Sequence, residues 1–365
     1  MCFLLINYPF LQIKSVQVLR LSISFLMFSA FFSCKKTEDH KNHQTVLNLD
    51  FPAAFVANGS SNDISVINLN TNKEHSKISL NGATFPHHIY ISPDKSKLAV
   101  AITSSDLSAG HGDHAGHGAS VLGLKVQILN TKTGAIEKEI ALNKMPHNAI
   151  FSPNGTELWL GQFDTTQSNV LVYNTSDWSL KNTIAVGKGL SEVTFSKSGT
   201  MVFATNTKDG TVSMIDATNK TVQKTIEVGL DPVGAWPGTD GNMYVDNEKS
   251  RTISVIEISS GTVINTIPLG YKPGYAAQHS NGELWVSDAT NGKVLVYELA
   301  SGTWVEKQKL VTGADAHAIT FSLDGSKAYV SNQGAGNVSV INTSNYSKVV
   351  DIVVGAKPNG IALKQ

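Results

Sequence analysis

A short strand-like pattern recurs along most of the chain at nearly constant spacing. The seven copies are ISVIN (64–68), VQILN (126–130), VLVYN (170–174), VSMID (212–216), ISVIE (253–257), VLVYE (294–298) and VSVIN (338–342). Their starting positions are separated by 62, 44, 42, 41, 41 and 44 residues, so the period is close to forty and only the first interval is long. This period predicts an array of structural repeats with an insertion in its first interval.

Each repeat holds four candidate strands. Alternating β-branched and aromatic residues, separated by Asn-Gly or Asp-Gly turns, predict consecutive antiparallel strands, and four strands in about forty residues match one propeller blade. The C-terminal PNGIALKQ (358–365) supplies the first strand of a repeat, and AAFVAN (53–58), ISVIN and SKISL (76–80) supply the other three. We therefore predict an all-β, seven-bladed β-propeller over residues 51–365, closed by pairing of N-terminal strands with the C-terminal strand.

The repeat units also resemble a known family. GSKAYVSNQGAGNVSVINTSNYSKVVDIVVGAKPNGIAL, with the variants AYVSN (328–332), MYVDN (243–247) and LWVSD (284–288), looks like the YVTN repeats of YncE-like seven-bladed β-propellers. The resemblance covers residues 52–365 and implies the same fold. It implies little about function: members are typically exported, and similar propellers include lactonases and the haem- or copper-binding domains of denitrification enzymes.

The segment before the repeats predicts export. Lys14 and Arg20 precede the apolar run LSISFLMFSAFF (21–32), which is too short for a comfortable membrane span and suits a signal-peptide core. We therefore predict a lipoprotein-type signal peptide over residues 1–33, followed by a polar tether over 34–50.

Ser33 and Cys34 end this apolar run and resemble a bacterial lipobox, which implies lipid attachment at Cys34. A plain signal peptide or a membrane anchor is the alternative. We expect an exported protein of the cell envelope, periplasmic or surface-facing, held on a bacterial membrane through Cys34. Cys2 would leave with the signal, so no internal disulfide is expected.

Charge argues against a polyanionic partner. Lysines plus arginines equal aspartates plus glutamates at 29 each, and Arg20 and Arg251 are the only arginines. Without a basic excess there is no electrostatic case for nucleic acid, and the scarcity of arginine weakens any nucleotide or phosphosugar interpretation. We expect a monomer that binds no nucleic acid.

Histidines occupy equivalent positions of the repeats. The residue after the proline-like position that opens each innermost strand is His87, His147, Ser191, Val233, Gly274, His317 or Asn359. Around the ring the order His317, Asn359, His87, His147 predicts one polar arc at the mouth of the central channel. His88 lies beside that arc.

The long first interval holds a second group of histidines. AGHGDHAGHG (109–118) contains His111, Asp113, His114 and His117, within an insertion over residues 104–120. The insertion joins the second and third strands of its blade, so we expect it on the face where the innermost strands begin.

Imidazoles on neighbouring strands suit a first-row transition metal such as zinc or copper. The predicted metal ligands are His87, His147, His317, His88, His111, Asp113, His114 and His117. Asp113 could ligate the metal or orient a histidine. The alternative is that channel-mouth histidines bind only water and that the glycine-rich stretch is a loop without a site.

The sequence carries no GxSxG elbow, no glycine-rich phosphate loop and no CxxC pair. Acidic residues such as Glu192 and Asp246 reach the same face, but most are interpreted as turn or solvated residues. We predict a binding protein for divalent copper or zinc with a protein or redox partner on the histidine-rich face. A metal-free protein- or glycan-binding scaffold and a lactonase-like hydrolase are the alternatives.

Overall fold

The structure is a computed structural model that describes residues 47–103, 105–107 and 123–365. In this part of the chain the regular structure consists of 28 strands and no helix. The described residues therefore contain no helix of the length and apolarity needed to cross a membrane.

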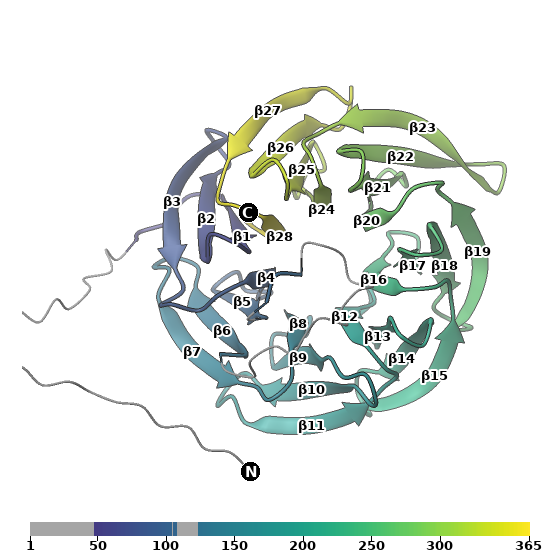
Figure 1. The fold of residues 1–365 in the computed structure, drawn as a ribbon, viewed down its shortest axis with the longest axis horizontal. Helices are drawn as coiled ribbons and strands as arrows, with labels where there is room; N and C mark the ends of the chain where they lie inside the picture. The colour runs from purple at the N-terminus through teal and green to yellow at the C-terminus, as the bar shows by residue number, and fades with distance from the viewer. Residues whose placement is uncertain (1–46, 104, 108–122) are drawn as a thin grey trace, which may run out of the picture. The chain divides into compact units, whose positions relative to one another are not determined.

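The strands form seven four-stranded antiparallel sheets arranged as the blades of a β-propeller (Figure 1). From the innermost strand outward, the first three blades after the N-terminal strands are β4 (Pro86–Ile91), β5 (Lys97–Ile102), β6 (Lys125–Asn130), β7 (Ile136–Ala141); β8 (Pro146–Phe151), β9 (Glu157–Gln162), β10 (Asn169–Asn174), β11 (Leu180–Ala185); and β12 (Leu190–Phe195), β13 (Met201–Asn206), β14 (Thr211–Asp216), β15 (Thr221–Glu227). The next three are β16 (Pro232–Pro237), β17 (Asn242–Asn247), β18 (Thr252–Glu257), β19 (Thr262–Pro268); β20 (Pro273–Gln278), β21 (Leu284–Asp288), β22 (Lys293–Ala300), β23 (Thr303–Val311); and β24 (Ala316–Phe321), β25 (Lys327–Asn332), β26 (Asn337–Asn342), β27 (Lys348–Val353).

The seventh blade is built from both ends of the described chain, as predicted. Its order is β28 (Pro358–Lys364), β1 (Ala53–Asn58), β2 (Asp63–Asn68) and β3 (Lys73–Ser79). β1 pairs antiparallel with β28, with Ala53 opposite Lys364 and Val56 opposite Ile361. This pairing closes the ring and covers the inner edge of β1.

Burial explains why the blades pack into a ring. The second and third strands of each blade are almost wholly buried, as in Leu158, Trp159 and Leu160 of β9, because both faces of a blade contact neighbouring blades. Trp159 meets Phe195 of the next blade edge to face, with ring centroids 5.4 Å apart. Trp159 therefore packs adjacent blades together.

Residues 47–50, which the sequence assigns to the end of the tether, already pack on the propeller. Leu49 is fully buried in the core cluster of the first blades, and its amide donates to the carbonyl of Lys132 at 2.8 Å. The signal peptide, the rest of the tether and Cys34 lie outside the described residues.

The innermost strands share an irregularity that shapes the channel. In β4, β8, β12 and β24 the register with the second strand shifts between the first and the fourth residue, as between Pro86 and Ile89. A β-bulge of this kind leaves two successive residues outside regular alternation, so the second and third residues of the strand can both project toward the channel.

Candidate metal centre in the channel

Three histidines from two adjacent blades converge at the channel. His87 and His88 belong to β4 and His147 to β8, and their ligand atoms all lie within 4.8 Å of one another. Their exposed fractions are 1%, 4% and 2%, so the cluster is shielded from bulk water. The ring centroids lie 4.4 to 4.8 Å apart.

The bulge in β4 explains how two successive residues enter one cluster. His87 and His88 stack with an interplanar angle of 25° and a centroid distance of 4.5 Å. In a regular strand their side chains would point to opposite faces. The register shift between Pro86 and Ile89 turns both rings to the same side.

A buried carboxylate orients the cluster. Oε2 of Glu192, from β12, lies 3.0 Å from Nδ1 of His147 and 3.4 Å from Nδ1 of His88. When Nδ1 donates to a carboxylate, the proton is held on Nδ1 and the Nε2 lone pair is available to a metal. Nε2 of His88 is buried and makes no hydrogen bond within the described residues.

The other carboxylate oxygen of Glu192 is fixed by neutral donors. Oε1 accepts from Nδ2 of Asn148 at 2.6 Å and from the hydroxyl of Tyr90 at 2.5 Å, and the amide of Glu192 donates to Oγ1 of Thr205 at 2.9 Å. Burial and the adjacent Glu192 raise the pKa of Tyr90 well above its usual range, which keeps the phenol protonated as a donor. One carboxylate oxygen is thus anchored and the other is directed at the imidazoles.

His317 and Asn359 continue the arc around the ring. The His317 ring lies 6.4 Å from His87 and 6.0 Å from His88, measured between centroids, and is outside the group of three. Asn359 accepts a hydrogen bond from Nε2 of Gln333 through Oδ1, and its carbonyl accepts from Oγ of Ser331 at 2.6 Å. Asn359 therefore holds adjacent blades together, while His317 stands beside the cluster.

The blade that begins at β16 carries a different polar group. Asp246 is fully buried, and its Oδ1 accepts from Nε1 of Trp236 at 2.7 Å and from the amide of Gly234 at 3.1 Å. Burial, with a smaller contribution from Glu248, raises the pKa of Asp246 to about 8. Trp236 in turn stacks on Tyr275 at 3.7 Å. This carboxyl is therefore mainly protonated at neutral pH.

Both described ends of the insertion lie beside the cluster. Oγ1 of Thr103, just after β5, donates to the carbonyl of Phe85, just before β4, at 2.9 Å. Leu107 and Leu124 pack together against Met145, which precedes β8. The described residues that flank the insertion, Thr103 and Leu124, therefore lie on the face where the innermost strands begin. His111, Asp113, His114 and His117 lie outside the described residues.

The structure brings together His87, His88 and His147 from the predicted set and adds Glu192. The sequence placed Glu192 on this face but did not connect it with the histidines, because the partner residues lie more than forty positions away. The signal that could have found it is its place in the repeat: Glu192 follows Ser191, as His88 follows His87. In a bulged innermost strand, the second and the third residue can both face the channel.

The donor set fits a transition metal. Three imidazoles and a hydrogen-bonded carboxylate form the nitrogen-rich arrangement that zinc and copper favour. A tetrahedral ion bound at about 2.0–2.1 Å holds its nitrogens roughly 3.4 Å apart. The observed upper limit of 4.8 Å therefore requires only small movements of the rings.

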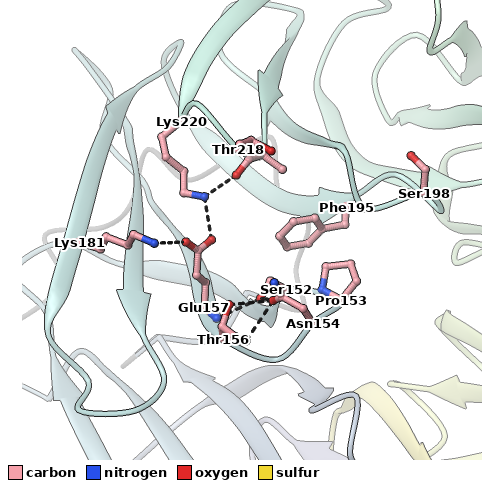
Figure 2. A pocket seen from close by; sticks show the side chains of 12 residues that line it. Ser152, Pro153, Asn154, Thr156, Glu157, Lys181, Phe195, Ser198, Thr218 and Lys220 are labelled. Carbon is pink, nitrogen blue, oxygen red and sulfur yellow. Dashed lines mark hydrogen bonds and ion pairs between the residues drawn. The ribbon is translucent and has the colours of Figure 1, made fainter.

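A pocket on the opposite face has a structural explanation (Figure 2). It has a volume of about 480 Å³ and is lined in part by Glu157. The Glu157 carboxylate pairs with Nζ of Lys181 at 2.7 Å and Nζ of Lys220 at 2.9 Å, and it accepts a hydrogen bond from Nε1 of Trp159 at 2.9 Å. Glu283 repeats this arrangement with Lys307, Tyr346 and Trp285. We call the two sets the Glu157 clamp and the Glu283 clamp.

Comparison with known proteins supports the fold. No family model and no curated protein matches the chain. Periplasmic gluconolactonase PpgL of Pseudomonas aeruginosa is similar, with 15% identity over 86% of this chain and 99% of its own and a TM-score of 0.69. A functionally unknown protein of Desulfotomaculum acetoxidans has 15% identity over 85% and 98%, with a TM-score of 0.68.

Hydrazine synthase of Kuenenia stuttgartiensis is also similar, with 17% identity over 76% of this chain and 89% of its own and a TM-score of 0.62. At these identities the likeness extends to the fold. The chain is a seven-bladed β-propeller, and its function has to be argued from its own channel.

Proposed function

We propose that this protein binds one divalent transition metal, copper or zinc, through His87, His88 and His147. The observation that carries the proposal is the convergence of three buried imidazoles whose ligand atoms lie within 4.8 Å of one another. Imidazole is the commonest protein ligand for such metals, and rigid neighbouring strands hold the rings in place before binding.

Glu192 supports this assignment through its contacts with the histidines. Its Oε2 lies within 3.4 Å of Nδ1 of both His88 and His147, the arrangement that orients metal-binding imidazoles in many proteins. Its negative charge also favours a bound cation inside a buried site. Within the described residues its carboxylate forms ion pairs with histidines and with no lysine or arginine.

The remaining assignments follow as parts of the same proposal. We place the chain among YVTN-repeat propellers that are exported and attached to a bacterial membrane through a lipid on Cys34. The residues flanking the histidine-rich insertion lie beside the cluster, so we propose His111, Asp113, His114 and His117 as additional ligands. His317 is a further candidate because its ring lies 6.0 Å from that of His88. A protein or redox partner would then meet this face.

Hydrolysis of a lactone is a second candidate function. Three protein ligands leave a coordination position open, and an open position is what metal-activated water uses in hydrolases. In this chain Glu192 and His317 are the nearest groups that could hold a substrate or a proton at that position.

The test is metal analysis of the purified protein, followed by calorimetric titration of the metal-free protein with Zn²⁺ and Cu²⁺. We expect one strong site that is lost in His88→Ala and in His147→Ala. His75→Ala is the matched control, because His75 is exposed on β3, where it contacts Ser76 and Phe51 and no residue of the cluster. Circular dichroism establishes that each variant is folded.

Binding that survives in both cluster variants would contradict the proposed site. No binding in the intact protein would leave a metal-free scaffold. A variant lacking residues 109–118 measures what the insertion adds, and lactone turnover that disappears with the metal would support the hydrolase.

A further inference from the structure

A second cavity lies at the end of the channel away from the histidine cluster. Its volume is about 350 Å³, and it lies where the innermost strands β4, β20, β24 and β28 end. Apolar side chains form its walls, among them Ile91, Phe321, Ile361 and Leu363. A concave, mainly apolar cavity with a few polar groups is typical of sites for small molecules, which begin at about 300 Å³.

Aromatic rings border this cavity on two sides. Tyr90 and Tyr275 line it together with Phe321, and Tyr275 is held by stacking on Trp236 at 3.7 Å with an angle of 30°. The hydroxyl of Tyr90 donates to Glu192, so Tyr90 separates the cavity from the polar cluster. Burial raises the pKa of Tyr275, which keeps its phenol uncharged. A flat aromatic ligand would find π-faces and ring edges here.

One cation stands at the rim. Lys95 is the only ionised side chain among the residues lining the cavity, and its ammonium makes no ion pair within the described residues. The adjacent Asp94 is engaged by Ser92 and Ser96 in the turn. Lys95 adopts a φ of 63° at a turn position where the three turns of the same length carry glycine, namely Gly155, Gly199 and Gly325. Among these four turns, only that of the β4 blade therefore carries a charged side chain at this position.

An apolar side chain opposite is left in contact with solvent. Leu323 lines the same cavity, and with 86% exposure it is the most exposed large apolar side chain in the described part of the chain. The corresponding turns carry Pro93, Pro153 and Lys197. An exposed leucine beside an apolar cavity is a common mark of a ligand site.

We propose that this cavity binds a small aromatic carboxylate, with its ring among Tyr90, Tyr275 and Phe321 and its carboxylate at Lys95. The site lies next to the histidine cluster, with Tyr90 between them, and does not require the metal. The neutral phenols and the apolar walls favour a ring over a sugar, and the single lysine favours an anion over a neutral compound.

The experiment is isothermal titration of the full chain with benzoate in the presence of EDTA. Benzyl alcohol tests the charge, and cyclohexanecarboxylate tests the planar ring. We expect saturable binding of benzoate that is at least tenfold tighter than binding of either comparison compound. Lys95→Gly, which installs the residue of the matching turns, should weaken benzoate at least tenfold and leave benzyl alcohol unchanged.

Lys197→Ala is the matched control, because it removes a lysine from the equivalent turn of the β12 blade. Benzoate affinity that is unchanged in Lys95→Gly, or reduced equally in Lys197→Ala, would overturn the proposal, as would the absence of saturable binding. Tighter binding of cyclohexanecarboxylate would also overturn the assignment of an aromatic ligand. Because benzoate is titrated in EDTA, saturable benzoate binding by a protein that does not bind Zn²⁺, or the reverse, distinguishes failure of this site from failure of the metal site.

Discussion

The carboxyl groups beside the channel differ from those in the two clamps on the opposite face. Glu157 and Glu283 are buried, but each carboxylate pairs with lysine, two for Glu157 and one for Glu283, and accepts a hydrogen bond from a tryptophan. Burial raises the pKa of Glu157, yet hydrogen bonds from Lys181 and Lys220 outweigh this effect and the net pKa is lowered. Glu192 and Asp246 receive only uncharged donors and imidazoles.

This difference distinguishes carboxyl groups that stabilise the fold from those that are candidates for a binding site. The clamp recurs in two blades, each time with a residue from the next blade, as expected of a device that joins blades. Glu192 and Asp246 each occur in one blade only. The joining of blades does not explain the charge of Glu192 or the proton on Asp246. Within a repeat protein, a buried carboxyl that breaks the repeat is the better candidate for a site.

Asp246→Asn should give the largest effect, and it appears in the pH dependence. The folded pKa of about 8 lies above the unfolded value near 3.8, so the wild type binds one more proton when folded between these pH values. Its contribution to stability is therefore present at low pH and is lost, by about 1.4 kcal/mol per pH unit, as the pH rises toward 8. Asn cannot titrate, so the variant should gain up to about 5 kcal/mol relative to the wild type across this range.

Urea denaturation of both proteins from pH 4 to pH 9 measures this difference. Only the change with pH matters, since the substitution can also shift the unfolding free energy by a constant amount. Parallel stability curves would show that Asp246 is ionised in the folded protein.

Glu157→Gln should destabilise the fold without affecting the metal site. The substitution leaves Lys220, whose side chain is only 10% exposed, without its carboxylate partner. Breaking a buried ion pair in this way costs about 3 kcal/mol. Denaturant unfolding should show this loss, while Zn²⁺ titration should match the wild type. A loss of metal affinity here would remove the distinction between clamp and channel.

Glu192→Gln should weaken metal binding without destabilising the fold. Gln keeps the shape of the side chain but is a weaker acceptor for His88 and His147, so we expect metal affinity to fall about 10- to 100-fold. Its unfolding midpoint in the metal-free state should stay close to that of the wild type, since no buried lysine or arginine is left unpaired. Unchanged metal affinity would mean that Glu192 does not orient the cluster.

Glu283→Gln should give the smallest effect. Lys307 is 37% exposed and keeps a second partner, Glu298, at 2.9 Å, so the expected loss is about 1 kcal/mol. The comparison with Glu157→Gln tests whether burial of the lysine sets the strength of a clamp. Equal losses in the two variants would show that it does not.

The sequence predicted the ring and its closure because strand patterns and turns repeat locally. The equivalence of His87, His147 and His317 followed from aligning the repeats. The position of Glu192 in the repeat offered a signal, but its pairing with His88 and His147 also depends on bulges that turn successive residues toward the channel, and the alignment does not record these. The raised pKa of Asp246 could not follow either, because it arises from complete burial. These features belong to packing between blades, which a periodic pattern does not record.

Closure of the ring through β28 and β1 also sets an order of events in time. Six blades are built from neighbouring segments and can form as soon as each stretch of chain is available. The seventh has to wait for Pro358–Lys364, and joining segments so distant in the chain is slow. Until then the inner edge of β1 is open to pairing with a strand of another molecule. We therefore expect the last step of folding to be both the slowest and the one most prone to aggregation.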